Sequence, residues 1–479
     1  MKVNHNIAAV LANNRLQITE GNLSDSIARL SSGYKINSAK DNPAGFAIAH
    51  RMQTQIRGLE RASNNALDGV SAIQTAEGAI NEIQEMVQRM RELAVQSAND
   101  TYTLQDREAI QAEAEKLQEE IQRISEQTEF NKKNLLDGTF DTRVFEDTDG
   151  VSVNVISEDV AAGNYKFEVT QVPTQTTLTC GAIKDAMFSQ SEATAEEGYV
   201  CINQMKVEFS TSESPEEIYG KLRDAAEAVG VKLEKDVNNN NNLVFTSEEP
   251  GSAYNIEVIA SSTTLATALG IDNPTLSPGK DLEIKLDTSD NASSRFTKTA
   301  SYSAKGNYVT ITDRGGFEMT VKIDDEVHKT LNSDKSIVGT KVTLDVKNYG
   351  AMSLQIGTNE NQTMEVKIPN MSLENMGIDK LNYLTHESAG EVIEKMDNAM
   401  AFISNVRARL GAYENRLDYT MSSLEVADLS MTEAYSRIMD TDMAEEMTKY
   451  TQYNVLQQAG VSVLAQANDL PQTILQLLQ

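Results

Sequence analysis

The segment His386-Glu387-Ser388-Ala389-Gly390 comes nearest to a catalytic motif in this chain. It begins like the HExxH motif of zinc proteases, in which two histidines one helical turn apart hold a single zinc ion. Gly390 stands at the position of the second histidine, so the motif lacks a zinc ligand. We therefore predict an exposed helix start at this segment and no protease.

Other residues that could carry chemistry are few and badly spaced. Gly270 and Gly279-Lys280 do not have the spacing of a phosphate-binding loop, and no serine, histidine and aspartate group predicts a nucleophile. The few histidines leave little material for a metal site; they are His5, His50, His328 and His386. The sequence thus predicts no enzyme, no cofactor and no metal.

Cys180 and Cys201 have two interpretations. They are either two small hydrophobic residues, which we favour, or a disulfide that closes a loop of about 20 residues in an oxidising compartment. The N-terminal residues show no apolar core followed by a cleavage pattern, so no cleavable signal peptide is expected. On composition alone, this favours the cytoplasm.

The composition excludes several partners. The 479 residues carry a net charge of −29, with no tryptophan, 5% aromatic residues and 8 prolines. A mean hydropathy of −0.40, without a run of about 18 apolar residues, predicts no membrane span. No basic stripe predicts nucleic-acid binding. Residues 1–60 are weakly cationic, but their apolar face is thin and rich in asparagine, so a membrane-surface helix is the weaker alternative.

The prolines divide the chain into helical ends and a different centre. None lies between Pro43 and Pro173 or between Pro369 and Pro471. Proline ends or kinks helices, so the two proline-free stretches are expected to be helical. From Met396 to Ile438 an apolar seam repeats at alternating spacings of three and four, which is typical of a coiled coil. A second, interrupted seam runs from Ile56 to Ala94, and a shorter helix with Ile110 to Ile124 on one face follows it.

Both chain ends predict amphipathic helices. Residues 4–32 align an apolar stripe on one face, and a C-terminal heptad frame begins at Tyr453, with Gly460 and Ala467 at its small positions. Neither stripe has an obvious cover within one chain, so we expect them to contact neighbouring copies. The candidate polymerisation residues are Leu16, Leu23, Ile27, Leu30, Leu456, Val463, Leu470, Ile474 and Leu477.

The centre of the chain predicts strands. Tyr165–Val169 and Val342–Val346 alternate apolar and polar residues, as half-buried strands do. One amphipathic helix is expected near Pro215–Val229, and Asn238–Asn242 reads as a polar loop. We therefore predict an α+β fold: a long antiparallel α-helical coiled-coil rod formed by both chain ends, with a β-rich insert at residues 176–350.

Motifs at both ends closely resemble bacterial flagellins. The stretch Leu30–Ala49 resembles the N-terminal signature of that family, and the tail Gln457–Asn468 resembles its C-terminal end. Further matches, in the order of the family, are Gln88–Asn99, Gln127–Gly138, Leu354–Thr363 and Gly411–Leu417. The resemblance thins between residues 176 and 350, where flagellins vary.

The resemblance implies a structural subunit that polymerises into the flagellar filament, a helical homopolymer outside the cell, for motility. It implies export without a cleaved signal peptide through the flagellar type III exporter, with a chaperone on the C-terminal end, and contacts with filament cap and junction proteins. The ends are expected to be disordered in the free monomer. It also implies five segments: tube helices at 1–42 and 439–479, rod segments at 43–175 (with a β-hairpin) and 351–438, and the variable insert at 176–350.

The resemblance further implies recognition by host Toll-like receptor 5 through the rod helices. The matching positions include Arg89 and Leu93, which we expect to face outward while the Met90–Ala94 seam is buried. They could equally be rod surface that packs against a neighbouring subunit. The full set of candidate receptor-binding residues is Arg89, Leu93, Glu113, Gln88, Met90, Glu92 and Gln96.

Two alternatives stay open. A hook–filament junction protein shares both ends of the flagellin pattern, although such proteins usually lack the full Gln88–Asn99 signature. The insert at 176–350 could also bind glycans or carry them on its serines and threonines, and the sequence does not decide this.

Overall fold

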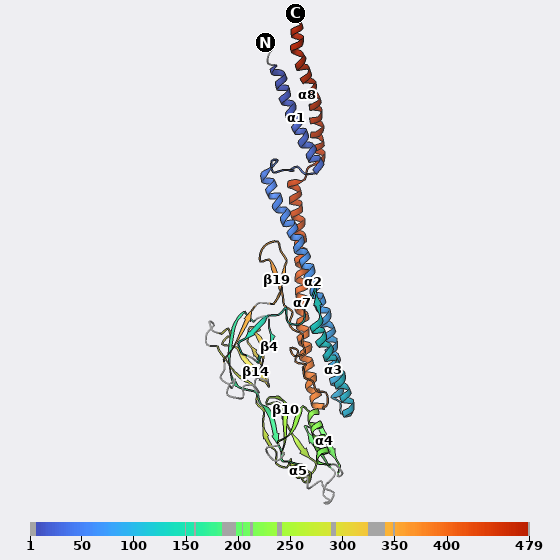
Figure 1. The fold of residues 1–479 in the computed structure, drawn as a ribbon, viewed down its shortest axis with the longest axis vertical. Helices are drawn as coiled ribbons and strands as arrows, with labels where there is room; N and C mark the ends of the chain where they lie inside the picture. The colour runs from blue at the N-terminus through green and yellow to red at the C-terminus, as the bar shows by residue number, and fades with distance from the viewer. Residues whose placement is uncertain are drawn as a thin grey trace. The chain divides into compact units, whose positions relative to one another are not determined.

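The computed structural model describes residues 6–148, 150–157, 160–183, 198–203, 205–210, 214–236, 242–288, 294–323, 341–347 and 350–477. They form two compact units (Figure 1). The first consists of Met1–Val70, Leu354–Met364 and Asn415–Gln479, and the second of Ser71–Ser353 and Glu365–Glu414. The predicted α+β class is confirmed, since long helices occupy both chain ends and strands fill the centre.

The first unit contains the two terminal helices, α1 (Ile7–Ser32) and α8 (Met443–Leu477), which run antiparallel and side by side (Figure 1). The Asn6 side chain accepts a hydrogen bond from the Ala9 amide and caps the start of α1. Gly33 ends α1 in the left-handed conformation, with φ at 76°, which glycine adopts without strain. Beyond it, Tyr34 forms a β-bridge with Asp440, so the chain segments at the inner ends of both helices are tied together.

Two further long helices, α2 (Pro43–Ser97) and α7 (His386–Met439), contribute residues to both units. Within the second unit they run antiparallel, because Gln84 contacts Arg407 and Arg91 contacts Asp397. The predicted α7 seam is buried from Met396 to Leu410 and again at Leu417, and it is only partly covered at Tyr413 and beyond Leu417. The seam of α2 is likewise buried from Ile73 to Ala94.

A third helix, α3 (Leu104–Gln127), packs beside α2 in the second unit. Thr103 and Asp106 form a capping box at its start, in which each side chain accepts a hydrogen bond from the backbone amide of the other residue. Two small hairpins complete the helical part: β1 (Glu129–Phe130) with β2 (Lys133–Asn134), and β18 (Met352–Gln355) with β19 (Thr363–Val366).

The β-rich part of the second unit has two separate cores. The first lies between two antiparallel four-stranded sheets and is built from residues such as Phe167, Ile311 and Leu344. One of these sheets has the order β13 (Glu283–Leu286), β5 (Gly163–Gln171), β17 (Lys341–Lys347) and β3 (Arg143–Glu146). The other has the order β14 (Ser301–Lys305), β15 (Tyr308–Thr312), β16 (Glu318–Ile323) and β4 (Val151–Ile156).

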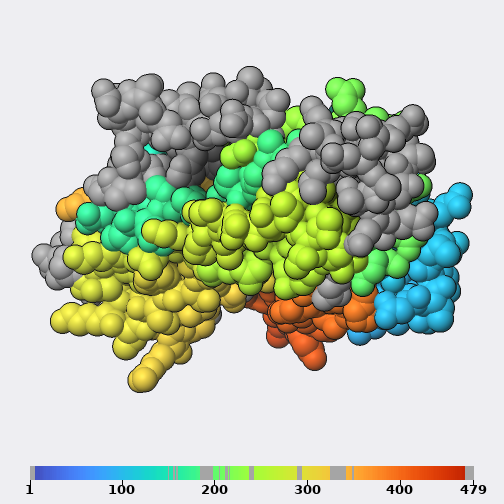
Figure 2. Space-filling view, turned by 90° about the horizontal axis from the view of Figure 1, so that it is seen from below, coloured from blue at the N-terminus to red at the C-terminus, as the bar shows by residue number. Residues whose placement is uncertain are grey.

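The second β core contains Phe245, Ile218 and Leu222 and is covered by two helices, α4 (Pro215–Ala228) and α5 (Thr263–Leu269). Its four-stranded sheet has the order β12 (Thr275–Ser277), β6 (Gln175–Thr179), β10 (Asn242–Pro250) and β9 (Val231–Asp236). Its three-stranded sheet has the order β11 (Val258–Ala260), β7 (Gly198–Ile202) and β8 (Met205–Phe209). Figure 2 shows the outer surface of the β-rich part, in which residues near 250 are yellow-green and residues near 300 are yellow.

The β-rich part begins earlier than expected, at Arg143 and not at residue 176. The reason is the pairing of β5 with β17: strands before residue 176 find their partners more than 150 residues later, so the boundary cuts through a sheet. The predicted helix at Pro215–Val229 is confirmed, with Val229 as its C-cap. The predicted loop Asn238–Asn242 lies mostly outside the described residues, and Asn242 itself opens β10.

Candidate functional site

The pairing surface of α1 and α8 is thin. Leu16, Leu23 and Leu30 recur every seven residues on α1 and are half-buried, and Ser26 is the buried residue of that helix. On the α8 side, a side chain at Gly460 would come within 3.1 Å of the Leu16 Cδ1 atom, so glycine leaves room for the leucine. Two helices that bury so little apolar surface gain little stability from each other alone.

The opposite face of α1 is apolar as well. Ile7 is 75% exposed, and Leu11 and Ile18 follow it at spacings that keep them on one side of the helix. On α8 the exposed apolar residues include Val455, Leu456, Val461 and Val463. Exposed apolar surface of this extent on a helix pair indicates a surface that is covered by a partner.

The predicted polymerisation residues therefore fall into two groups. Leu16, Leu23 and Leu30 face α8, whereas Ile27, Leu456 and Val463 are about half exposed. The side chains of Leu470, Ile474 and Leu477 lie outside the described residues. Sequence reasoning missed the second apolar stripe, that of Ile7, Val10, Leu11 and Ile18, because it looked for one seam per helix.

Arg89 is the centre of an exposed polar cluster between α2 and α3. Its Nε and Nη2 atoms donate to Glu113 Oε1 at 3.0 and 2.7 Å, and its Nη1 atom lies 3.5 Å from Glu92 Oε2. The hydrogen bond from Arg89 to Glu113, together with the charge of that carboxylate, raises the pKa of the guanidinium. Gln88 and Gln96 are exposed on the same helix. The cluster presents a fixed guanidinium and amides to solvent.

The expectation that Leu93 faces outward is wrong. Leu93 is 1% exposed and Met90 is fully buried. The Tyr383 hydroxyl donates to the Met90 carbonyl at 3.3 Å, and Ser97 donates to the Tyr383 carbonyl, so the segment before α7 covers this face of α2. Because α3, α7 and this segment all pack against α2, more than one stripe of the helix is buried, which a single-seam prediction cannot show.

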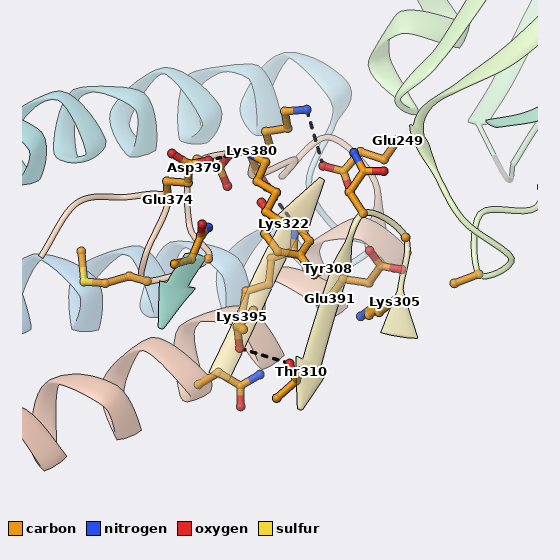
Figure 3. Close-up of a pocket in the computed structure, with 18 of the residues that line it drawn as sticks. Glu249, Lys305, Tyr308, Thr310, Lys322, Glu374, Asp379, Lys380, Glu391 and Lys395 are labelled. Atoms are coloured by element: carbon orange, nitrogen blue, oxygen red, sulfur yellow. Dashed lines mark hydrogen bonds and ion pairs between the residues drawn. The ribbon is translucent and has the colours of Figure 1, made fainter. Parts of the chain in front are cut away.

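A cavity of about 500 Å³ lies in the second unit between β15, β16, the residues before α7 and the first turns of α7 (Figure 3). Four of its charged side chains form two ion pairs: Lys322 with Glu374, and Lys380 with Glu249 at 3.9 Å. Glu249 also accepts a hydrogen bond from the Tyr254 hydroxyl. Burial, with the charge of Glu249, raises the pKa of Tyr254. These pairs tie the strands to the residues before α7.

The residues that resembled chemical sites do not form one. His386 opens α7, and its Nδ1 atom contacts the Ala98 carbonyl. Cys180 and Cys201 are both free thiols, so the disulfide alternative is wrong, and burial raises the pKa of Cys180 to about 11. Among the described residues, no three histidine, cysteine or carboxylate side chains cluster as metal ligands. In that same part of the chain, every helix is too short or too polar to cross a membrane.

Comparison with known proteins gives consistent matches at both chain ends and over the full length. The family model for the bacterial flagellin N-terminal helical region matches residues 3–141, and that for the C-terminal helical region matches residues 393–478. A flagellin of Salmonella rubislaw is 32% identical over 503 residues, covering 100% of this chain and 99% of that protein. The B-type flagellin of Pseudomonas aeruginosa is 32% identical over 512 residues and is covered completely.

Solved structures match less well. The D2–D3 domains of a flagellar cap protein from Escherichia coli are 16% identical and cover 43% of this chain and 99% of their own, with a TM-score of 0.30. The full-length sequence relatives, and not such structures, therefore carry the family assignment.

Proposed function

Since the chain belongs to the bacterial flagellin family, whose members it matches from end to end, we propose that it polymerises into the flagellar filament through its two terminal helices. The observation that supports this role of the ends is the apolar surface left on α1 and α8. Ile7, Val10, Leu11 and Ile18 are 57 to 75% exposed on a helix whose other face is already paired.

Identical subunits joined by head-to-tail contacts that do not close form a helical filament. Each exposed apolar side chain that becomes buried contributes about 1.5–3 kcal/mol before the entropy of association is subtracted. The free energy gained by burying the stripes of both helices is enough to couple the ordering of the chain ends to assembly. The tube segments are then 1–42 and 439–479, the rod comes from 43–142 and 351–438, and the sheets from Arg143 onward form the outer part.

We expect limited proteolysis to cut both ends of the free monomer first, because the α1–α8 pair buries so little surface. In assembled filaments the same sites should be protected, since neighbouring copies cover them. Mass spectrometry of the fragments measures both states. Monomer that keeps residues 1–40 and 440–479 intact under conditions that cut loops of the outer part would contradict the proposal.

The same family membership supports a route of export from the cell and contacts with partners other than the chain itself. The chain leaves the cell uncleaved through the flagellar type III exporter, with a chaperone on its C-terminal end, and meets the cap and junction proteins at the ends of the filament. Helical ends with little buried surface suit export in an unfolded state. We also propose that the subunit lies outside the cell, as part of the flagellum, which family membership supports.

The chain is also a ligand of host Toll-like receptor 5 in this proposal, with the Arg89 cluster as the contact. Arg89, Glu92, Glu113, Gln88 and Gln96 are exposed on α2 and α3 and accessible to a partner. Met90 and Leu93 contribute by packing beneath them and not by contact.

Replacing Arg89 by alanine should lower receptor signalling about tenfold or more, because a guanidinium anchored by two hydrogen bonds is the kind of group that dominates an interface. A reporter cell assay with purified monomer measures this. Arg123→Ala is the matched control: Arg123 is also an exposed arginine, paired with Glu120 on α3, and its loss should leave signalling unchanged. Equal signalling by the Arg89 variant and the wild-type chain would reject the receptor contact.

A further inference from the structure

Glu446 is a buried carboxylate in the thin surface between α1 and α8. Its side chain is 5% exposed, and its Oε1 atom lies 3.8 Å from Arg29 Nη1 on the other helix. Lys449, one turn further along α8, lies 3.7 Å from Oε2. Ser26, which is 1% exposed, directs its hydroxyl to the Glu446 carbonyl at 3.5 Å. A charge that is removed from water in this way is stable only with its partners in place.

The apolar contacts of the same surface do not define one alignment. On α1, Leu16, Leu23 and Leu30 repeat every seven residues, and on α8 the facing positions Tyr453, Gly460 and Ala467 repeat at the same interval. A slip of one helix by seven residues, or about 10 Å, therefore places leucines over facing positions again. After that slip, Leu23 would replace Leu16 opposite Gly460.

The ion pair distinguishes these alignments from within the helix pair, and polar contacts at its two ends differ between them as well. In the observed one, contacts progress from Asn6 with Ala467 at one end to Tyr34 with Asp440 at the other, and Arg29 meets Glu446. A slip by seven residues would bring Asn22 or Ile36 to the place of Arg29, and neither carries a positive charge. Lys449 moves together with Glu446 on the same helix, so it stabilises the carboxylate in every alignment and selects none.

We propose that Arg29 and Glu446 fix the register in which α1 pairs with α8 in the filament subunit. The inference rests on the proposed function, because the pair is expected to form fully only on assembly. A single buried polar contact that selects one register among repeating apolar contacts is an established role for such groups.

Cysteine cross-linking in filaments of the full chain tests this, with Cys180 and Cys201 replaced by alanine. The pair Leu16→Cys with Gly460→Cys reports the observed register, and Leu23→Cys with Gly460→Cys reports the slipped one. Adding Glu446→Gln should raise the slipped cross-link at least about tenfold. The double variant Arg29→Gln with Glu446→Gln, which buries no unpaired charge, should give the same ratio of slipped to observed cross-links. Arg15→Gln, an exposed arginine on the same helix, should leave the slipped signal at background.

The inference is overturned if the slipped cross-link stays at background in both glutamine variants. It is also overturned if both fail to assemble while Arg15→Gln assembles, since a register determinant changes alignment and not the ability to assemble. If the unsubstituted full chain forms no filaments, it is the proposed function that fails. A mobility shift of the monomer band separates cross-links within one chain from those between copies.

Discussion

Replacing Leu456 and Val463 by aspartate should abolish filament formation by the full chain. Both side chains are about half exposed on α8, so the substitutions leave the interior of the monomer untouched. In the filament they would lose about 1.5–3 kcal/mol of apolar burial at each position and would also bury two carboxylates without partners. Sedimentation of purified protein after nucleation measures assembly, and circular dichroism confirms that helix content is retained.

Gln466→Asp provides the matched control for this pair. Gln466 is exposed on the same helix and is already polar, so a carboxylate there removes no apolar contact. Its assembly should be close to that of the unchanged chain. If the Leu456 and Val463 double variant sedimented as filaments to the same extent as the control, the exposed stripe of α8 would have no part in assembly.

Leu93→Ala should destabilise the second unit by about 2–5 kcal/mol, because a fully buried leucine is removed from a packed interior. Chemical denaturation followed by circular dichroism measures the loss. Receptor signalling by this variant should fall only where its unfolded fraction rises, since Leu93 does not reach the surface. A separate Leu93→Met variant, which keeps the volume of the side chain, should have nearly the stability and signalling of the unchanged chain.

Arg89→Ala is expected to behave in the opposite way. Its side chain is 48% exposed, so the denaturation midpoint should barely change while signalling is lost. Comparing the two variants therefore distinguishes a residue that contacts the receptor from one that only stabilises the fold. Normal stability with lost signalling for Leu93→Ala would contradict the burial of this residue in the receptor-competent monomer.

The long helices and their seams could be predicted from the sequence because the apolar residues of a coiled-coil interface recur at a fixed spacing. The α7 seam is buried from Met396 to Leu410 and again at Leu417, as its alternating spacing predicts. Beyond Leu417 the seam is only partly covered, and two apolar residues outside it, Val426 and Leu429, are 66% and 62% exposed. The amphipathic helix at Pro215 could also be predicted from its apolar face. Ser214 and Glu217 form a capping box before that face.

Features that depend on distant segments could not be predicted. Leu93 is buried because the residues around Tyr383 cover a second face of α2, almost 300 positions along the chain. The β-rich part starts at Arg143 because β3 and β5 both pair with β17. Spacing within a helix or strand carries no information about such partners. The second apolar stripe of α1, that of Ile7, Val10, Leu11 and Ile18, was missed because only one apolar face was expected on each helix.

Electron microscopy of purified protein tests the central claim most directly, by comparing the full chain with a truncated chain of residues 40–440. The account predicts helical filaments from the full chain and none from the truncated one, because the truncation removes α1 and α8, with their exposed apolar stripes, and keeps the second unit whole. Circular dichroism of the truncated chain controls for folding. Filaments formed by residues 40–440 would contradict the role assigned to the two ends.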